Sequence, residues 1–298
     1  MIPAERGLLL LCSHLGQAQA RPLTTAQLRL LRQRVLAAGT APDDALQGEV
    51  CTGDIMALGY DADEASRMVA LLSRAAVLDG YLLAAQRCGI FPVTRLTSDY
   101  PKALREKRGG DAPAVLFCAG NRALLQSACV AVVGSRKLTD AGASFAAMAG
   151  MLAAKEGLTL VTGGAEGADM TALEACLSRG GRAVVFVPDD LRSRLSLAGE
   201  RCLVCSEQGY DLPFSAQRAL SRNACIHMLA SKTLVAQTGH GAGGTWSGSV
   251  ENLKHGWSEL YVNQDDSPGA AALLELGATA VQTLTTLAGL LPNQQSLF

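Results

Sequence analysis

Apolar positions in the first 88 residues recur with the period of an α-helix. Three helices are expected: one from Thr24 or Thr25 to about Ala38, one capped by Asp61 or Asp63, and one from Ala75 to Cys88. Their inward faces are expected to carry Leu28, Leu31 and Val35 in the first helix and Met68, Leu71 and Leu72 in the second. Residues 1–88 are therefore predicted to form a small helical domain, which is typical of a scaffold or of a module that contacts DNA or protein.

From about Ile90 onward, short apolar runs alternate with helical periodicity. Strands are expected at 90–94, 115–118, 128–133, 158–162, 183–188, 233–237 and 259–262, and helices at 141–154, 169–179, 217–229 and 247–255. Near-continuous apolar strands separated by helices indicate a parallel sheet that is covered on both faces. Residues 89–290 are therefore predicted to form a doubly wound, mainly parallel α/β sheet of the Rossmann-like class. A last helical stretch is expected from Leu284 to Leu291, followed by a tail at 291–298.

Three of the expected strands end in glycine-rich turns that lead into helices. The residues expected to bind phosphate are Gly134, Ser135, Arg136 and Lys137 in the first turn, Gly163, Gly164 and Gly167 in the second, and Gly244, Thr245 and Ser247 in the third. The carboxyl ends of parallel strands meet at one edge of the sheet, where such folds bind ligands. Glycine lets the backbone approach a phosphate closely, and the following helix presents unpaired N–H groups. The sequence therefore predicts a phosphate-binding site at this edge.

Each turn also has a purely structural explanation, as a tight connection between a strand and a helix. Asp169, Thr245 and Ser247 stand near helix starts, where such residues are typical N-caps. The first turn adds more specific chemistry, because Arg136 can grip a phosphate with two parallel hydrogen bonds and Lys137 adds a point charge. Three such turns at one sheet edge favour a binding site over three unrelated connections.

Charge and cysteine content limit the classes of function. The 298 residues include 26 basic and 27 acidic side chains, so any contact with nucleic acid must be a local patch rather than an effect of bulk charge. The N-terminus lacks the basic start and long apolar stretch of a signal peptide, and no run reaches the ~18 apolar residues of a membrane span. Nine cysteines in such a chain indicate reduced thiols and a cytoplasmic protein without membrane contact.

Several chemistries are not favoured, and neither a cofactor nor a metal is expected. The first turn lacks the companion glycines of the dinucleotide fingerprint, and a Walker P-loop is absent from the sequence. Cys202 and Cys205 form a lone CxxC pair without two further zinc ligands, so chance spacing is the preferred interpretation. His240 and Trp246 lie in or beside the third turn, where a solvated loop and ordinary packing explain them, although Trp246 is also suited to stack on a base.

The order of motifs along about 190 residues resembles the DprA/Smf family of DNA-processing proteins. The matching segments are Ser98-Asp99-Tyr100-Pro101, Pro113 to Phe117, Val132 to Arg136, Gly163 to Asp169, Cys205-Ser206-Glu207 with Phe214, Ser221-Arg222-Asn223, and Leu276-Gly277-Ala278. This resemblance implies a non-enzymatic protein that binds single-stranded DNA, forms a homodimer and helps to load a RecA-type recombinase in transformation or recombinational repair. It also implies that Arg136, the glycine turns, Arg222 and Asn223 face the DNA.

The sequence departs from the family pattern at three places. Glu166 stands where many members have an arginine in the second turn, and Ala224 replaces the last arginine of an Arg-Asn-Arg stretch. A winged-helix domain of the kind often found at the family's C-terminus is not expected. A second hypothesis is therefore a nucleotide-type small-molecule sensor or a phosphoribohydrolase that uses the same pocket, because Gly243-Gly244-Thr245 with Glu251 resembles the glycine-threonine-glutamate turn of such hydrolases.

The tail at 291–298 ends in two bulky apolar side chains at a free terminus. Gln294, Leu297 and Phe298 belong to a pentapeptide that resembles the Gln-x-Ser-Leu-Phe motif by which bacterial replication and repair proteins bind the sliding clamp. Docking of this tail on the body of the protein is the alternative explanation. The sequence thus predicts either a self-docked tail or a peptide that binds the clamp.

Overall fold

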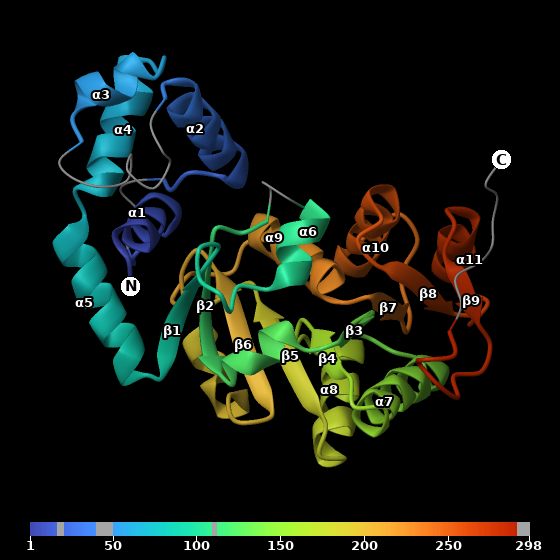
Figure 1. The fold of residues 1–298 in the computed structure, drawn as a ribbon. Coiled ribbons are helices and arrows are strands. Elements are labelled where there is room, and N and C mark those ends of the chain that lie inside the picture. The colour runs from blue at the N-terminus through green and yellow to red at the C-terminus, as the bar shows by residue number, and fades with distance from the viewer. Residues whose placement is uncertain (17–20, 40–49, 109–111, 291–298) are drawn as a thin grey trace.

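A computed structural model describes residues 1–16, 21–39, 50–108 and 112–290 of the chain (Figure 1). The helical region contains α1 (Pro3–Cys12), α2 (Thr25–Ala37), α3 (Thr52–Ala57), α4 (Ala62–Leu72) and α5 (Ala75–Arg87). No single helix within these residues has the length and hydropathy of a membrane span, and α4 and α5 meet that criterion only as a pair bent by 48°.

Helices α2, α4 and α5 begin where the sequence predicts them, whereas α1 and α3 were not among the three expected helices. The Thr24 side chain caps α2 by accepting a hydrogen bond from the Gln27 amide, and Asp61 caps α4 by accepting one from the Glu64 amide. The residues expected on the inward faces, Leu31 and Val35 in α2 and Met68 and Leu71 in α4, are buried, while Leu28 and Leu72 are partly buried against the same core. The helical periodicity therefore identified the inward faces of α2 and α4 correctly.

The rest of the described chain forms a nine-stranded sheet with the order β1-β2-β6-β5-β4-β3-β7-β8-β9. Its strands are β1 (Ile90–Thr94), β2 (Val115–Gly120), β3 (Cys129–Val133), β4 (Thr159–Thr162), β5 (Arg182–Val187), β6 (Cys202–Glu207), β7 (Lys232–Val235), β8 (Glu259–Asn263) and β9 (Thr279–Val281). The neighbouring strands in the series β6-β5-β4-β3-β7-β8-β9 run parallel. Strand β2 pairs with both β1 and β6 in antiparallel register. The predicted Rossmann-like α/β class is confirmed.

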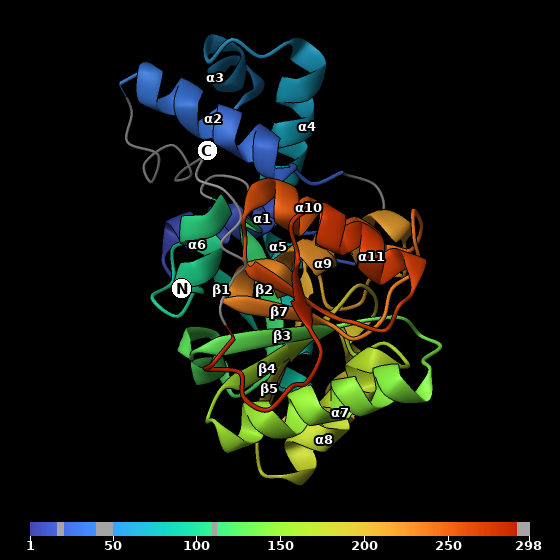
Figure 2. The same cartoon turned by 90° about the vertical axis from the view of Figure 1, so that its right-hand side faces the viewer.

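Helices cover both faces of this sheet (Figure 2). They are α6 (Lys102–Arg108), α7 (Asp140–Lys155), α8 (Ala168–Ser178), α9 (Ala216–Leu229), α10 (Gly244–His255) and α11 (Pro268–Glu275). Helices α7 and α8 pack on one face, and α9, α10 and α11 pack on the other. This double cover explains why β3 and β4 are buried at every position and read as continuous apolar runs.

The order β4-β3-β7 places three neighbouring parallel strands side by side in the middle of the sheet. Parallel strands end at the same edge, so the turns that follow β3, β4 and β7 emerge together. These are the three glycine-rich turns, and their predicted clustering is therefore correct.

The C-terminal part of the described chain differs from the expectation. The segment 284–290, expected to be helical, is irregular, and the sheet continues through α11 to a further strand, β9. Glu156, the C-cap residue of α7, accepts hydrogen bonds from the backbone N–H groups of Leu287 and Ala288, at 2.8 Å each, and from the Thr286 hydroxyl. A side chain about 130 positions away thus binds the backbone of this irregular segment.

The helical region and the sheet share one hydrophobic core. Leu9, Leu11 and Leu78 belong to the same buried cluster as Phe117 and Val204 of the sheet. The boundary between a helical domain at 1–88 and a domain at 89–290 therefore stays a prediction, and the expected tail at 291–298 lies outside the described residues.

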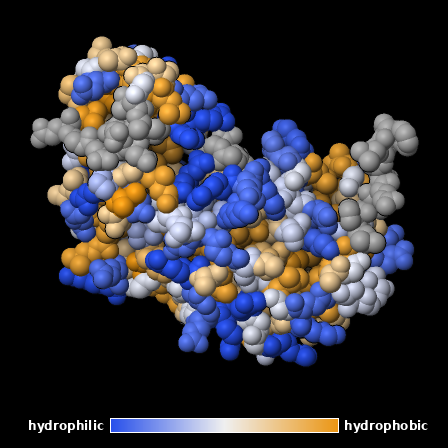
Figure 3. Space-filling model, in the orientation of Figure 1, coloured by the Kyte–Doolittle hydropathy of each residue, from blue (hydrophilic) through white to orange (hydrophobic). Residues whose placement is uncertain are grey.

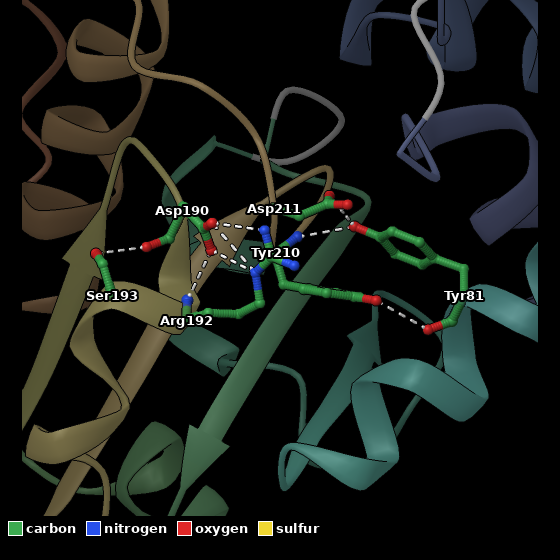
Figure 4. Close-up of polar contacts among 6 residues, drawn as sticks. All are labelled: Tyr81, Asp190, Arg192, Ser193, Tyr210 and Asp211. Atoms are coloured by element: carbon green, nitrogen blue, oxygen red, sulfur yellow. Dashed lines mark hydrogen bonds and ion pairs between the residues drawn. The ribbon is translucent and has the colours of Figure 1, made fainter.

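A tyrosine pair fixes α5 against the loop that follows β6 (Figure 4). The rings of Tyr81 and Tyr210 stack with their centres 4.3 Å apart, and the Tyr81 hydroxyl donates a 2.7 Å hydrogen bond to Asp211 while accepting one from the Tyr210 amide. Arg192, held by Asp190 at 2.7 Å, lies 5.9 Å from the centre of the Tyr210 ring. This cluster joins residues about 130 positions apart and holds the helical region to the sheet.

Tyr81→Phe should lower the free energy of unfolding by about 2 kcal/mol, because it leaves a carboxylate and a buried amide without their partner. Urea unfolding of the full chain measures this change. The matched control is Tyr60→Phe, since the buried Tyr60 hydroxyl has no hydrogen-bond partner in the described part of the chain. Equal losses in both variants would show that the Tyr81 hydrogen bonds contribute nothing specific.

Candidate functional site

The first two glycine turns are packed directly against each other. Gly167 has a φ of +83°, and a Cβ at this position would collide with the carbonyl oxygens of Ser135 and Arg136. The Ala168 amide donates a 3.2 Å hydrogen bond to the Ser135 carbonyl. Only glycine allows this approach, so Gly167 serves the contact between the turns.

The third turn is tied to the first by side-chain and backbone hydrogen bonds. The Thr245 hydroxyl donates to the Gly134 carbonyl at 2.9 Å, and the Ser135 amide donates to the Gln237 carbonyl at 2.9 Å. The N-cap interpretation of Thr245 and Ser247 is therefore wrong: α10 begins at Gly244, and its N-cap is Gly243, with a φ of +94°. The positive φ lets the helix start earlier than the sequence pattern indicated.

The three turns form one wall of a cavity of about 800 Å³, called the glycine cavity below. Most of the predicted site residues line it: Gly134, Ser135, Arg136, Gly163, Gly164, Arg222, Asn223, Gly244 and Thr245. Lys137, Gly167 and Ser247 are not among its described lining residues, although Lys137 is exposed directly beside Arg136. The structure thus brings together nearly all the residues that the sequence singled out.

The Asp169 carboxylate binds backbone amides of the second turn, where a phosphate was expected to bind. Its carboxylate accepts hydrogen bonds from the backbone amides of Gly163 and Ala165, at 3.2 and 3.3 Å, and is only 6% exposed. The N-cap interpretation of Asp169 is wrong, because Gly167 is the N-cap of α8 and makes no side-chain cap. Burial raises the pKa of Asp169 to about 6, although nearby Arg222 and the two amides oppose this shift.

Arg222 lies beneath the second turn rather than on the protein surface. Its side chain is buried, its Nη1 donates to the Phe186 carbonyl at 3.0 Å, and burial lowers the pKa of its guanidinium. A Cβ on Gly163 would collide with that guanidinium and lie 2.7 Å from the Asp169 carboxylate. Asn223 donates to the Gly244 carbonyl at 3.0 Å and so positions the third turn. Both residues line the cavity, and both also shape it.

The charges around the glycine cavity are divided between its turns. Arg136 and Lys137 are exposed on the first turn, whereas the second turn carries exposed Glu166 and buried Asp169. An anion is therefore attracted to the first turn and repelled from the second.

Sequence reasoning missed part of the lining. Asp189 and Arg194 follow β5, and Phe214 and Leu220 stand beside and on α9, with exposed fractions of 57% and 50%. The end of β5 was a usable signal, because that strand is parallel to β4 and ends at the same edge. The rim position of Phe214 and Leu220 has no such signal, since it depends on how α9 crosses the sheet.

The remaining candidates have structural explanations. Cys202 and Cys205 are buried on strand β6, and no cluster of metal-ligating side chains occurs within the described ranges. His240 packs edge-on against Trp246, with ring centres 5.1 Å apart. Glu251 pairs with Lys254 and His255 on the surface of α10 and is not among the described residues that line the cavity.

Fold and site together define a Rossmann-like protein with a glycine-lined cavity at the carboxyl ends of its strands. Residues 92–291 match the family of DNA recombination-mediator protein A, and the chain belongs to this family. The resemblance inferred from the motif order is thereby confirmed. A comparison with curated proteins finds no match.

Two solved structures share the fold. DNA processing protein A from Streptococcus pneumoniae superposes with a TM-score of 0.68 at 24% identity, covering 88% of this chain and 95% of that one. DNA processing protein A from Helicobacter pylori, described for its single-stranded DNA binding mode, superposes with a TM-score of 0.56 at 24% identity, covering 65% of this chain and 92% of that one.

Asp169→Asn should change how stability depends on pH. The pKa of Asp169 is about 6 in the folded protein, above its ordinary 3.8, so folding disfavours the ionised form. Its contribution to stability is therefore complete below about pH 4 and is lost as the pH rises through about 6. The free energy of unfolding of the wild type, relative to the variant, should fall between these values and stay level above them. Urea unfolding at several pH values measures it, and a difference that grows with pH would contradict the assignment.

Proposed function

We propose that this protein binds single-stranded DNA at the glycine cavity and acts in DNA processing without catalysing a reaction. The observation that carries the proposal is the packing of the first and third glycine turns beside Arg136 at the mouth of the cavity. Backbone amides and a guanidinium bind phosphates irrespective of base sequence. A local cationic turn also explains how a protein of net charge −1 can hold a polyanion.

The phosphates are proposed to follow the first and third turns and to avoid the second. Asp169 already occupies the amides of Gly163 and Ala165, and Glu166 adds an exposed negative charge beside them. Phe214 and Leu220, which also line the cavity, offer exposed apolar surface to bases, and a phenyl ring stacks on any base. Such a path binds the strand without reading its sequence.

In the cell, the proposed role is to help load a RecA-type recombinase on single-stranded DNA in transformation or recombinational repair. Family membership supports this role and a cytoplasmic homodimer. A two-fold pair would align two glycine cavities, and two linked weak sites hold one strand more tightly than either site alone.

Arg136→Ala should weaken binding of oligothymidylate about tenfold and reduce the slope of log affinity against log salt by about 0.7, as expected for one lost phosphate contact on a single strand. Glu166→Arg should act in the opposite direction. Fluorescence polarisation over a range of salt concentrations measures both.

Arg179→Ala is the charge-matched control, since Arg179 is exposed at the C-terminal end of α8, away from the turns. If Arg136→Ala and Arg179→Ala bind alike, the first turn does not hold the strand. If mononucleotides raise the melting temperature while oligonucleotides fail to bind, the cavity holds a small molecule instead.

The tail is proposed to tether the protein to the sliding clamp, with Leu297 and Phe298 filling an apolar pocket and Gln294 fixing the peptide. A labelled peptide ending at Phe298 should bind purified clamp with micromolar affinity in a polarisation assay, and replacement of Leu297 and Phe298 by alanine should abolish binding. Absence of binding at about 100 μM peptide would show that the tail has another role.

A further inference from the structure

Helix α9 separates two cavities of similar size. Ala219, Asn223 and Ile226 line the glycine cavity, whereas Gln217, Ser221 and Cys225 line a second cavity of about 800 Å³. The spacing of these positions places the two sets on opposite sides of one helix, so the cavities lie on either side of it. A helix is about 10 Å wide. Single-stranded DNA with a rise of about 3.4 Å per nucleotide crosses this width in about three nucleotides.

The second cavity lies between the Rossmann-like sheet and the helical region. The start of α2 lines it with Thr24 and Thr25, and the loop after β6 lines it with Asp211. Arg218 in its wall faces Glu207, whose charge is of opposite sign, as is that of Asp211. The interior therefore offers hydrogen-bonding groups of both signs, which suit a neutral base or a sugar better than a phosphate.

Two exposed arginines of α2 lie on the surface beside this cavity. Thr25, Arg29 and Arg32 are spaced by four and three residues, so they share one face of α2, called the basic face below. Helix α2 contains no acidic residue, and its core contacts come from a different face, through Leu31 and Val35. Figure 3 shows hydrophilic side chains gathered over the end of α2 that lies nearest the sheet.

The remaining arginine of α2 has a different role. Arg34 points to another side of the helix, where its guanidinium lies 4.0 Å from the centre of the Tyr60 ring. The positive charges of the basic face are therefore Arg29 and Arg32, which follow Thr25 along α2 from the edge of the second cavity. Leu36, 51% exposed, lies on the same face one turn further on.

We propose that the second cavity and the basic face of α2 form a further single-stranded DNA site, which takes the part of the strand that leaves the glycine cavity across α9. Bases enter the second cavity, and phosphates contact Arg29 and Arg32. This inference rests on the proposed function, because it extends the same strand from one cavity to the next. It assigns a direct role in DNA binding to the helical region.

The test compares oligothymidylates of about 6 and about 20 nucleotides, since sites of this kind cover about 4–16 nucleotides. Arg29→Ala with Arg32→Ala should weaken binding of the longer oligonucleotide about tenfold, lower its salt slope by about 1.4, and leave the shorter one unaffected. Arg29→Lys with Arg32→Lys should keep most of the affinity, because the charges remain. Arg87→Ala, which removes an exposed arginine at the end of α5, should have no effect.

The outcomes separate this inference from the proposed function. If Arg136→Ala weakens both oligonucleotides while the double alanine variant binds the longer one like the wild type, the further site does not exist and the glycine cavity still binds DNA. Equal losses in the double variant and in Arg87→Ala, or a loss with the shorter oligonucleotide, would also overturn the inference. If the wild type binds neither oligonucleotide, the proposed function itself fails.

Discussion

The glycine cavity depends on the buried charges of Asp169 and Arg222, which meet at Gly163. A side chain at Gly163 would collide with the guanidinium and crowd the carboxylate, so this glycine is required for space. Removal of the Arg222 guanidinium would leave the ionised Asp169 carboxylate buried without an opposite charge, which is strongly destabilising. This arrangement holds the second turn against α9, and the second turn in turn supports the first through Gly167. The cavity wall is thus prepared before any ligand arrives.

The same arrangement gives the first and second turns different roles. The Asp169 carboxylate already binds two amides of the second turn, so this turn supports the cavity wall instead of binding a ligand. The first turn carries the positive charge through Arg136 and Lys137. Glu166 fits this division because it lies on the supporting turn. A protein with balanced total charge can therefore bind a polyanion along a narrow path.

Sequence periodicity predicted the fold well because the strands of a doubly covered parallel sheet are apolar throughout and the helices have regular faces. The glycine turns were found for the same reason, since each directly follows an apolar run. Their internal contacts were not predictable: the Asp169 carboxylate binds amides a few residues away, but its electrostatic partner Arg222 lies on another helix. Likewise, nothing near Thr286 in the sequence indicates that the distant Glu156 would bind this segment. Such contacts depend on the finished fold rather than on local pattern.

Hydrogen–deuterium exchange with and without oligothymidylate tests the central claim most directly. The account predicts slower exchange for amides in residues 136–137 and 239–244 when DNA is bound, because phosphates occupy the first and third turns. It predicts no change for the amides of Gly163 and Ala165, which Asp169 already binds. Protection at Gly163 and Ala165 without protection of the first and third turns would contradict the account.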